Sequence, residues 1–171
     1  MKTVFDVIII GGGQAGLAAG YYLQRKGLSF QILEASGLAA GSWPNYYDSL
    51  KLFSPAKYSS LPGFRFPGDP NRYPLRDEVI DYLQEYAKRF RLPILTHHKV
   101  ETVKKTGNGF EVQTTDKKTH YAKAVISATG SFHSPYKPKI AGLEQYRGQV
   151  LHASEYRNPV EFKNKRVVVV G

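Results

Sequence analysis

The sequence has no cysteine. This absence excludes disulfides, cysteine-ligated zinc and thiol catalysis within the chain. It also has no apolar run that approaches the ~18 residues needed to span a membrane. At the N-terminus, Phe5-Asp6-Val7 leads directly into a glycine-rich turn, which is not the pattern of a signal peptide. We therefore expect a cytoplasmic protein with no membrane partner.

Acidic residues are scarce, with 14 against 24 basic ones and a formal net charge of +10. Such a balance can indicate binding to nucleic acid or to a membrane surface. The basic residues are scattered along the chain, however, and no nucleic-acid motif accompanies them. Solvated surface charge is the better explanation, and we expect no nucleic-acid partner. The hydrophobic content of 42% allows a core, and 171 residues suit one domain.

The first part of the chain has the pattern of a βαβ unit. Residues 4–10 are apolar and β-branched, which predicts a buried strand. Three glycines end it, and residues 14–26 then carry a broad apolar helical face that Gly27 terminates. Residues 30–34 predict a second strand, so the unit is complete within 31 residues, as a dinucleotide-binding motif requires.

Each glycine of the Gly11-x-Gly13-x-x-Gly16 turn has a physical task. Gly11 permits the tight turn, Gly13 lets the backbone approach a pyrophosphate, and Gly16 allows close packing of helix on strand. The start of the helix then offers free N–H groups and a positive dipole to phosphates. Glu34 ends the second strand 18 residues past Gly16, where a carboxylate can accept hydrogen bonds from ribose hydroxyls.

The remaining pattern predicts an α/β, Rossmann-like dinucleotide-binding domain with a central parallel sheet, one helical layer and a small antiparallel β-meander. Residues 35–74 show no sustained periodicity, and a loop that long is usually either functional or a sign that an element has been misread. The other expected elements are a helix at 76–90, a strand at 93–95, hairpin strands at 99–105, 110–115 and from 119, a separate buried strand at 124–127, and a valine strand at 166–170.

The glycine fingerprint alone does not decide between FAD and NAD, but the sequence that follows it does. A Gly-, Trp-, Tyr- and Pro-rich segment and a meander replace the further βα units of a dehydrogenase. Here the chain resembles the flavin-containing monooxygenase superfamily, in particular its CzcO-like and YUCCA-like members, over almost its whole length. The motifs that carry the resemblance run from Gly11 to Ala19, then Glu34-Ala35, Gly41-Ser42-Trp43, residues 47–55, Leu61-Pro62-Gly63, Arg72-Tyr73-Pro74 and Ala128-Thr129-Gly130.

The most diagnostic motif is Tyr146-x-Gly148-x-x-x-His152-x-x-x-Tyr156. It is similar to the Phe-x-Gly-x-x-x-His-x-x-x-Tyr/Phe motif that identifies these monooxygenases. It departs from that motif at Tyr146, and Arg157 follows where the family usually has Lys or Asp. These departures do not change the resemblance to the superfamily, but they leave open to which branch of the superfamily the chain is most similar.

The resemblance implies that the chain binds FAD and acts with NADPH, O2 and a small-molecule substrate. NADPH would reduce the flavin, and the reduced flavin would activate O2 to oxygenate a soft nucleophile or a ketone. We assign no catalytic side chain and no metal site, and we interpret His97-His98 as a polar strand start. The predicted cofactor-binding residues are Gly11, Gly12, Gly13, Gln14, Ala15, Gly16, Glu34, Ala35, Gly41, Ser42, Trp43, Val100, Ala128, Thr129 and Gly130.

Residues 167–171 echo residues 7–11, which predicts that a second nucleotide-binding fingerprint begins where the chain ends. We therefore expect an incomplete FAD-binding domain at 1–157, and a linker with the first strand of a truncated NAD(P)-binding domain at 158–171. An isolated chain of this kind would be inactive. Two alternatives remain: a flavin disulfide-reductase-like protein, which the lack of cysteine disfavours, and a non-catalytic or truncated FAD-binding module.

Overall fold

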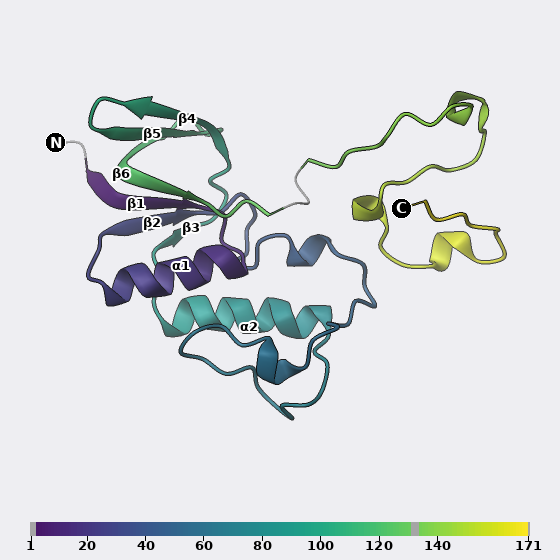
Figure 1. The fold of residues 1–171 in the computed structure, drawn as a ribbon, viewed down its shortest axis with the longest axis horizontal. Coiled ribbons are helices and arrows are strands. Elements are labelled where there is room, and N and C mark those ends of the chain that lie inside the picture. The colour runs from purple at the N-terminus through teal and green to yellow at the C-terminus, as the bar shows by residue number, and fades with distance from the viewer. Residues whose placement is uncertain (1–2, 131–133, 171) are drawn as a thin grey trace.

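A computed structural model describes residues 3–130 and 134–170. One mixed sheet of six strands has the order β3-β2-β1-β6-β5-β4 (Figure 1). The strands are β1 (Val4–Ile10), β2 (Phe30–Leu33), β3 (Ile94–Leu95), β4 (Val100–Thr106), β5 (Gly109–Thr114) and β6 (Thr119–Ser127). The helices are α1 (Gln14–Arg25) and α2 (Arg76–Arg89). The described helices do not include one long and apolar enough to cross a membrane.

Strands β3, β2, β1 and β6 are parallel, and β5 and β4 continue the sheet in antiparallel pairing. The chain leaves β1 through α1 and returns in β2, which is the predicted βαβ unit. Both helices lie on the same side of the sheet, with α2 packed against α1 (Figure 1). The predicted fold class, an α/β Rossmann-like fold, is confirmed.

The main core lies between the sheet and the helices, because alternate residues of a strand face opposite sides. Val7, Ile9 and Ile32 pack on this side against Leu17 of α1 and Leu83 of α2. Ile8 and Leu33 face the other way and form a smaller cluster with two residues of the meander, Val112 and Ala122. The meander therefore covers part of the face that the helices leave open.

The long segment between β2 and α2 is held by tyrosines of α2. Tyr86 is fully buried, and its hydroxyl donates a hydrogen bond of 2.7 Å to the carbonyl of Pro62. The Tyr82 hydroxyl accepts from the Leu61 N–H and donates to the Phe64 carbonyl, each at 2.6 Å. Burial raises the pKa of both hydroxyls, so they remain protonated donors. Side-chain hydrogen bonds thus supplement the two isolated β-bridges of this segment, Lys51 with Leu75 and Leu61 with Phe64.

Two predicted strands are wrong. Residues 124–127 are not a separate buried strand, since β6 runs unbroken from Thr119 to Ser127 and Ala124 is exposed. The strand is continuous because one of its edges pairs with β5 while the other pairs with β1. Residues 166–170 form no strand, and Val169 is 90% exposed. A strand needs a hydrogen-bonded neighbour, and these residues have none within 3–130 and 134–170. Gly171 lies outside the described residues.

Replacement of Tyr86 by Phe should lower the free energy of unfolding by about 1 kcal/mol, because the Pro62 carbonyl loses its donor. Urea denaturation of both proteins measures the difference. The control is Tyr58→Phe, since the Tyr58 ring is 75% exposed and water can replace its hydroxyl partner. An equal loss in the two variants would contradict the role given to the Tyr86 hydroxyl.

Candidate functional site

A cleft of about 820 Å³ lies at the carboxyl ends of β1, β2 and β6. Strands β2 and β6 flank β1 on opposite sides, and the crevice outside such strand ends is where open α/β sheets bind ligands. The lining residues are Ile10, Gly11, Gly13, Gln14, Ala15, Leu33, Glu34, Ala35, Ser36, Gly41, Ser42, Trp43, Asn45, Tyr46, His98, Lys99, Val100, Ser127, Ala128, Thr129 and Gly130.

Gly11 allows the chain to turn sharply after β1, in the space between the ends of β2 and β6. Its φ is +108°, and a Cβ built there would lie 2.3 Å from the carbonyl oxygen of Ala128. The Gly11 N–H donates to the Leu33 carbonyl at 2.8 Å, and the Ala128 N–H donates to the Ile10 carbonyl at 2.8 Å. The turn is thereby fixed to both neighbours of β1, with no room for a side chain.

The start of α1 opens into the cleft, with Gln14 and Ala15 in the lining. Over the described residues, no side chain caps this end of the helix and no acidic residue stands in its first turn. The amide groups in the first turn of any helix have no helical acceptor, and here no side-chain cap among the described residues takes its place. The helix dipole also presents its positive end there. This combination favours a phosphate group at that position.

The loop after β2 approaches the helix start through a second close backbone contact. Gly41 has φ +55°, and a Cβ there would lie 2.7 Å from the Cα of Gly13. The next residues, Ser42 and Trp43, line the cleft. The Trp43 ring also packs against the main core and lies 5.2 Å from the Tyr46 ring, measured between centroids. Trp43 is thus both a cleft residue and a core aromatic.

Glu34 is a buried carboxylate with a fixed orientation. The residue is only 5% exposed. Its Oε2 accepts a hydrogen bond from the Gly12 N–H at 2.6 Å, and its Oε1 accepts one from the Ser36 N–H at 2.7 Å. Each carboxylate oxygen has a second lone pair and can still accept a further hydrogen bond. Because Glu34 also lines the cleft, it can receive the hydroxyl groups of a ribose.

Two of the predicted residues lie behind the lining rather than in it. The Gly12 N–H is used to hold Glu34. A Cβ on Gly16 would lie 1.9 Å from the Gly11 carbonyl oxygen, so this glycine permits the packing of α1 on the turn. Gly12 and Gly16 therefore shape the cleft without lining it. All the other predicted cofactor-binding residues line the cleft.

Sequence reasoning missed several lining residues. Ile10, Leu33, Ser36 and Ser127 adjoin predicted residues at strand ends, whereas Asn45 and Tyr46 belong to the segment without periodicity. His98 and Lys99 also line the cleft. Their position beside the predicted Val100 was the one available signal.

The interpretation of His97-His98 as a strand start is wrong. His97 has φ +58°, and the two N–H groups donate to the carbonyls of Ser36 and Glu34 at 2.9 and 2.8 Å. These bonds carry the chain from β3 past Glu34 before β4 begins. The described part of the chain contains no group of three or more His, Asp or Glu residues that could hold a metal ion.

A polar cluster surrounds His98 at one side of the cleft. Its Nδ1 lies 2.7 Å from the Thr96 carbonyl and therefore carries a proton. Lys118 lies 3.3 Å from the His98 Nε2 and 3.0 Å from Asp116. Hydrogen bonds from the Thr114 hydroxyl and from Lys118 lower the pKa of Asp116 to about 2, so the carboxylate is ionised. The cluster orders the turn that precedes Val100.

Comparison with known proteins agrees with this geometry. Residues 8–171 match the sequence model of the pyridine nucleotide-disulphide oxidoreductase family. A CzcO-like oxidoreductase of Geobacillus kaustophilus is 42% identical over 100% of this chain and 49% of its own length. YUCCA1 of Arabidopsis thaliana, a proposed indole-3-pyruvate monooxygenase, is 37% identical over 98% of this chain and 42% of its own length.

A solved structure of the flavin-containing monooxygenase of Stenotrophomonas maltophilia shares the fold, with a TM-score of 0.90 and 43% identity over 95% of this chain. The match covers 49% of that protein, and the chain spans about half the length of the curated relatives it matches. These relatives agree with the resemblance seen in the sequence motifs. The family match extends over almost all of the described chain, and the chain therefore belongs to the pyridine nucleotide-disulphide oxidoreductase family.

Proposed function

We propose that this chain is the FAD-binding part of an NADPH-dependent, monooxygenase-like flavoprotein oxidoreductase. The observation that carries the proposal is the cleft, in which an uncapped helix start, a fixed buried carboxylate and two close glycine contacts converge. The 43% identity to a flavin-containing monooxygenase supports it. The whole protein's activity is part of the proposal, because the relatives are about twice as long.

The residues of the cleft fit FAD. The pyrophosphate would lie at the N-terminus of α1 beside Gly13, where a Cβ would crowd it. Glu34 would accept the hydroxyls of the adenosine ribose, and the adenine would lie beside Val100. The flavin end would then lie toward the wall formed by Trp43 and residues 128–130, which complete the lining.

When bound, FAD supplies the redox chemistry, which is hydride acceptance from NADPH and activation of O2 for transfer to a small-molecule substrate. The side chains of this chain bind and orient it. Glu34 would fix the ribose, and the first turn of α1 would neutralise phosphate charge. The Gly11 turn sets the distance between Glu34 and the start of α1. We assign no general acid or base to the described residues.

We further propose the division into an FAD-binding domain at 1–157 and the start of an NAD(P)-binding domain at 158–171. In support, residues 167–170 repeat the apolar strand pattern of residues 7–10. A cytoplasmic location remains a prediction. Between the alternatives, the lack of cysteine disfavours a disulfide reductase whose redox pair lies within the chain. The non-catalytic FAD-binding module differs from the main proposal only in whether NADPH is oxidised.

Replacement of Gly41 by Ala should weaken FAD binding about tenfold. The new Cβ would lie 2.7 Å from the Gly13 Cα, and the left-handed backbone conformation adds strain of about 1 kcal/mol. Quenching of flavin fluorescence on titration with the protein measures the affinity. Gly142→Ala is the matched control, because Gly142 has a similar φ of +82° but nothing within 4 Å of the added atom. Equal affinities for the two variants would argue against a phosphate site beside Gly13.

The purified chain should bind added FAD weakly and should not oxidise NADPH. The visible absorption spectrum before and after desalting shows whether flavin is retained, and the loss of NADPH absorbance shows turnover. If FAD shows no change in its absorbance or fluorescence on titration with a large excess of the chain, the proposed cofactor is overturned. NADPH oxidation by this chain alone would contradict its assignment as an incomplete part. A longer chain that extends past Gly171 and still leaves NADPH unoxidised would favour the non-catalytic module.

A further inference from the structure

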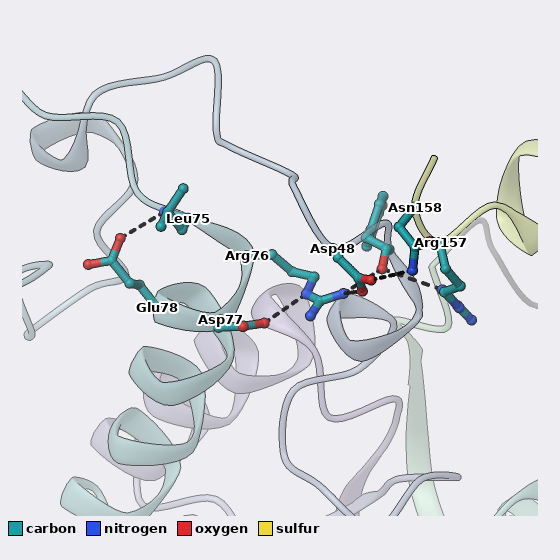
Figure 2. A network of polar contacts seen from close by, with 8 residues as sticks. Asp48, Leu75, Arg76, Asp77, Glu78, Arg157 and Asn158 are labelled. Carbon is teal, nitrogen blue, oxygen red and sulfur yellow. Dashed lines mark hydrogen bonds and ion pairs between the residues drawn. The ribbon is translucent and has the colours of Figure 1, made fainter. Parts of the chain in front are cut away.

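Three segments that are far apart in the sequence meet at Asp48 (Figure 2). Its Oδ1 accepts from Arg76 at 2.8 Å, and its Oδ2 accepts from the Asn158 side-chain amide at 2.9 Å. Its backbone N–H donates to the Arg157 carbonyl at 2.8 Å. These bonds join the segment after β2, the first residue of α2 and the segment that follows the 146–156 motif. We call Asp48, Arg76 and Asn158 the clasp.

Arg76 is better buried than Asp48, the residue that it binds in the clasp. Its side chain is 15% exposed, compared with 51% for Asp48. Its Nη1 also donates to the Tyr46 carbonyl at 2.9 Å, and its backbone N–H donates to the Leu50 carbonyl at 2.9 Å. The Glu78 carboxylate accepts the Leu75 N–H at 2.8 Å and so fixes the start of α2, which is visible in Figure 2. Arg76 therefore holds the 46–50 backbone from a rigid helix end.

The clasp borders the cofactor cleft. Asn45 and Tyr46 line the cleft, and the Tyr46 carbonyl accepts from Arg76 and, at 3.4 Å, from Arg157. The Tyr47 and Tyr156 rings lie beside the clasp, with centroids 6.0 Å apart. The same few atoms thus determine where the cleft wall lies and where the 157–158 segment attaches.

We infer that the clasp couples cofactor binding in the cleft to the attachment of the 157–158 segment, with Asp48 as the positioning residue that links the two. This inference rests on the proposed function, namely that the cleft binds FAD. A ligand that presses on the Asn45–Tyr46 wall favours the arrangement in which Asp48 reaches Asn158. By linkage, detachment of the segment lowers the affinity for the ligand by the same factor by which the bound ligand favours attachment.

Trypsin measures this coupling, since the peptide bond after Arg157 contains the carbonyl that Asp48 binds. Saturating FAD should slow cleavage after Arg157 about fivefold, the lower end of typical coupling. Cleavage after Lys163 should not change, because its peptide has no contact with the clasp, which makes it an internal control. The fragments are followed by mass spectrometry, with and without FAD, for each variant.

Asp48→Ala removes the carboxylate that binds Arg76 and Asn158 but keeps the backbone N–H that binds the Arg157 carbonyl. It should therefore lower the FAD-dependent protection after Arg157 and raise the FAD dissociation constant by the same factor. Asn158→Ala, which leaves the cleft wall intact, should lower the protection as well, and it serves as the second variant if Asp48→Ala folds poorly. The matched control is Asp77→Ala. Asp77 binds Arg76 at 2.8 Å and is 72% exposed, but it has no bond to the 157–158 segment.

The outcomes separate the two proposals. If the unaltered chain binds FAD but cleavage after Arg157 is unaffected, or if Asp77→Ala acts like Asp48→Ala, the coupling is overturned and the FAD site stands. If the unaltered chain does not bind FAD at all, the proposed function fails and the coupling fails with it. Lower protection in Asp48→Ala and Asn158→Ala, with protection kept in Asp77→Ala, supports the clasp.

Discussion

The constraint on which the site depends is the close approach of three backbone segments at the end of β1. Gly11 lies against the carbonyl of Ala128, Gly16 lies against the carbonyl of Gly11, and Gly41 lies against Gly13. No side chain fits at these contacts, so the spacing of the segments is set by backbone atoms alone. The floor of a cleft built in this way is set by backbone contacts rather than by side-chain rotamers.

The carboxylate of Glu34 depends on the same floor. Its two oxygens are held by amide groups of Gly12 and Ser36, one from the glycine turn and one from the loop after β2. Because these two amides belong to different segments, the carboxylate also ties the segments together. Its orientation toward the cleft is thus a consequence of the turn geometry. A shift of the turn would move the helix start and the carboxylate together.

Local pattern predicted the parts of the fold that local interactions determine. The β1–α1–β2 unit followed from apolar periodicity and Gly27, and α2 followed from its apolar face. The segment at 35–74 could not be predicted in detail, because Tyr82 and Tyr86 hold it through hydroxyl groups that come later in the chain. Residues 166–170 have strand composition, but a strand also requires a neighbour, which composition does not report.

The candidate site divides in the same way. The glycines at 11–13 and Glu34 were predictable because they follow or end strands that the apolar pattern marks, whereas Gly41 and residues 128–130 were predicted from the resemblance to flavin-containing monooxygenases. His98 and Lys99 reach the cleft only because the chain docks on the backbone of Ser36 and Glu34 after β3. Two titratable residues of the described lining already bind backbone groups: His98 binds the Thr96 carbonyl, and Glu34 binds the amides of Gly12 and Ser36. These hydrogen bonds give both side chains a positioning role, which agrees with the proposal that the chain binds and orients a cofactor.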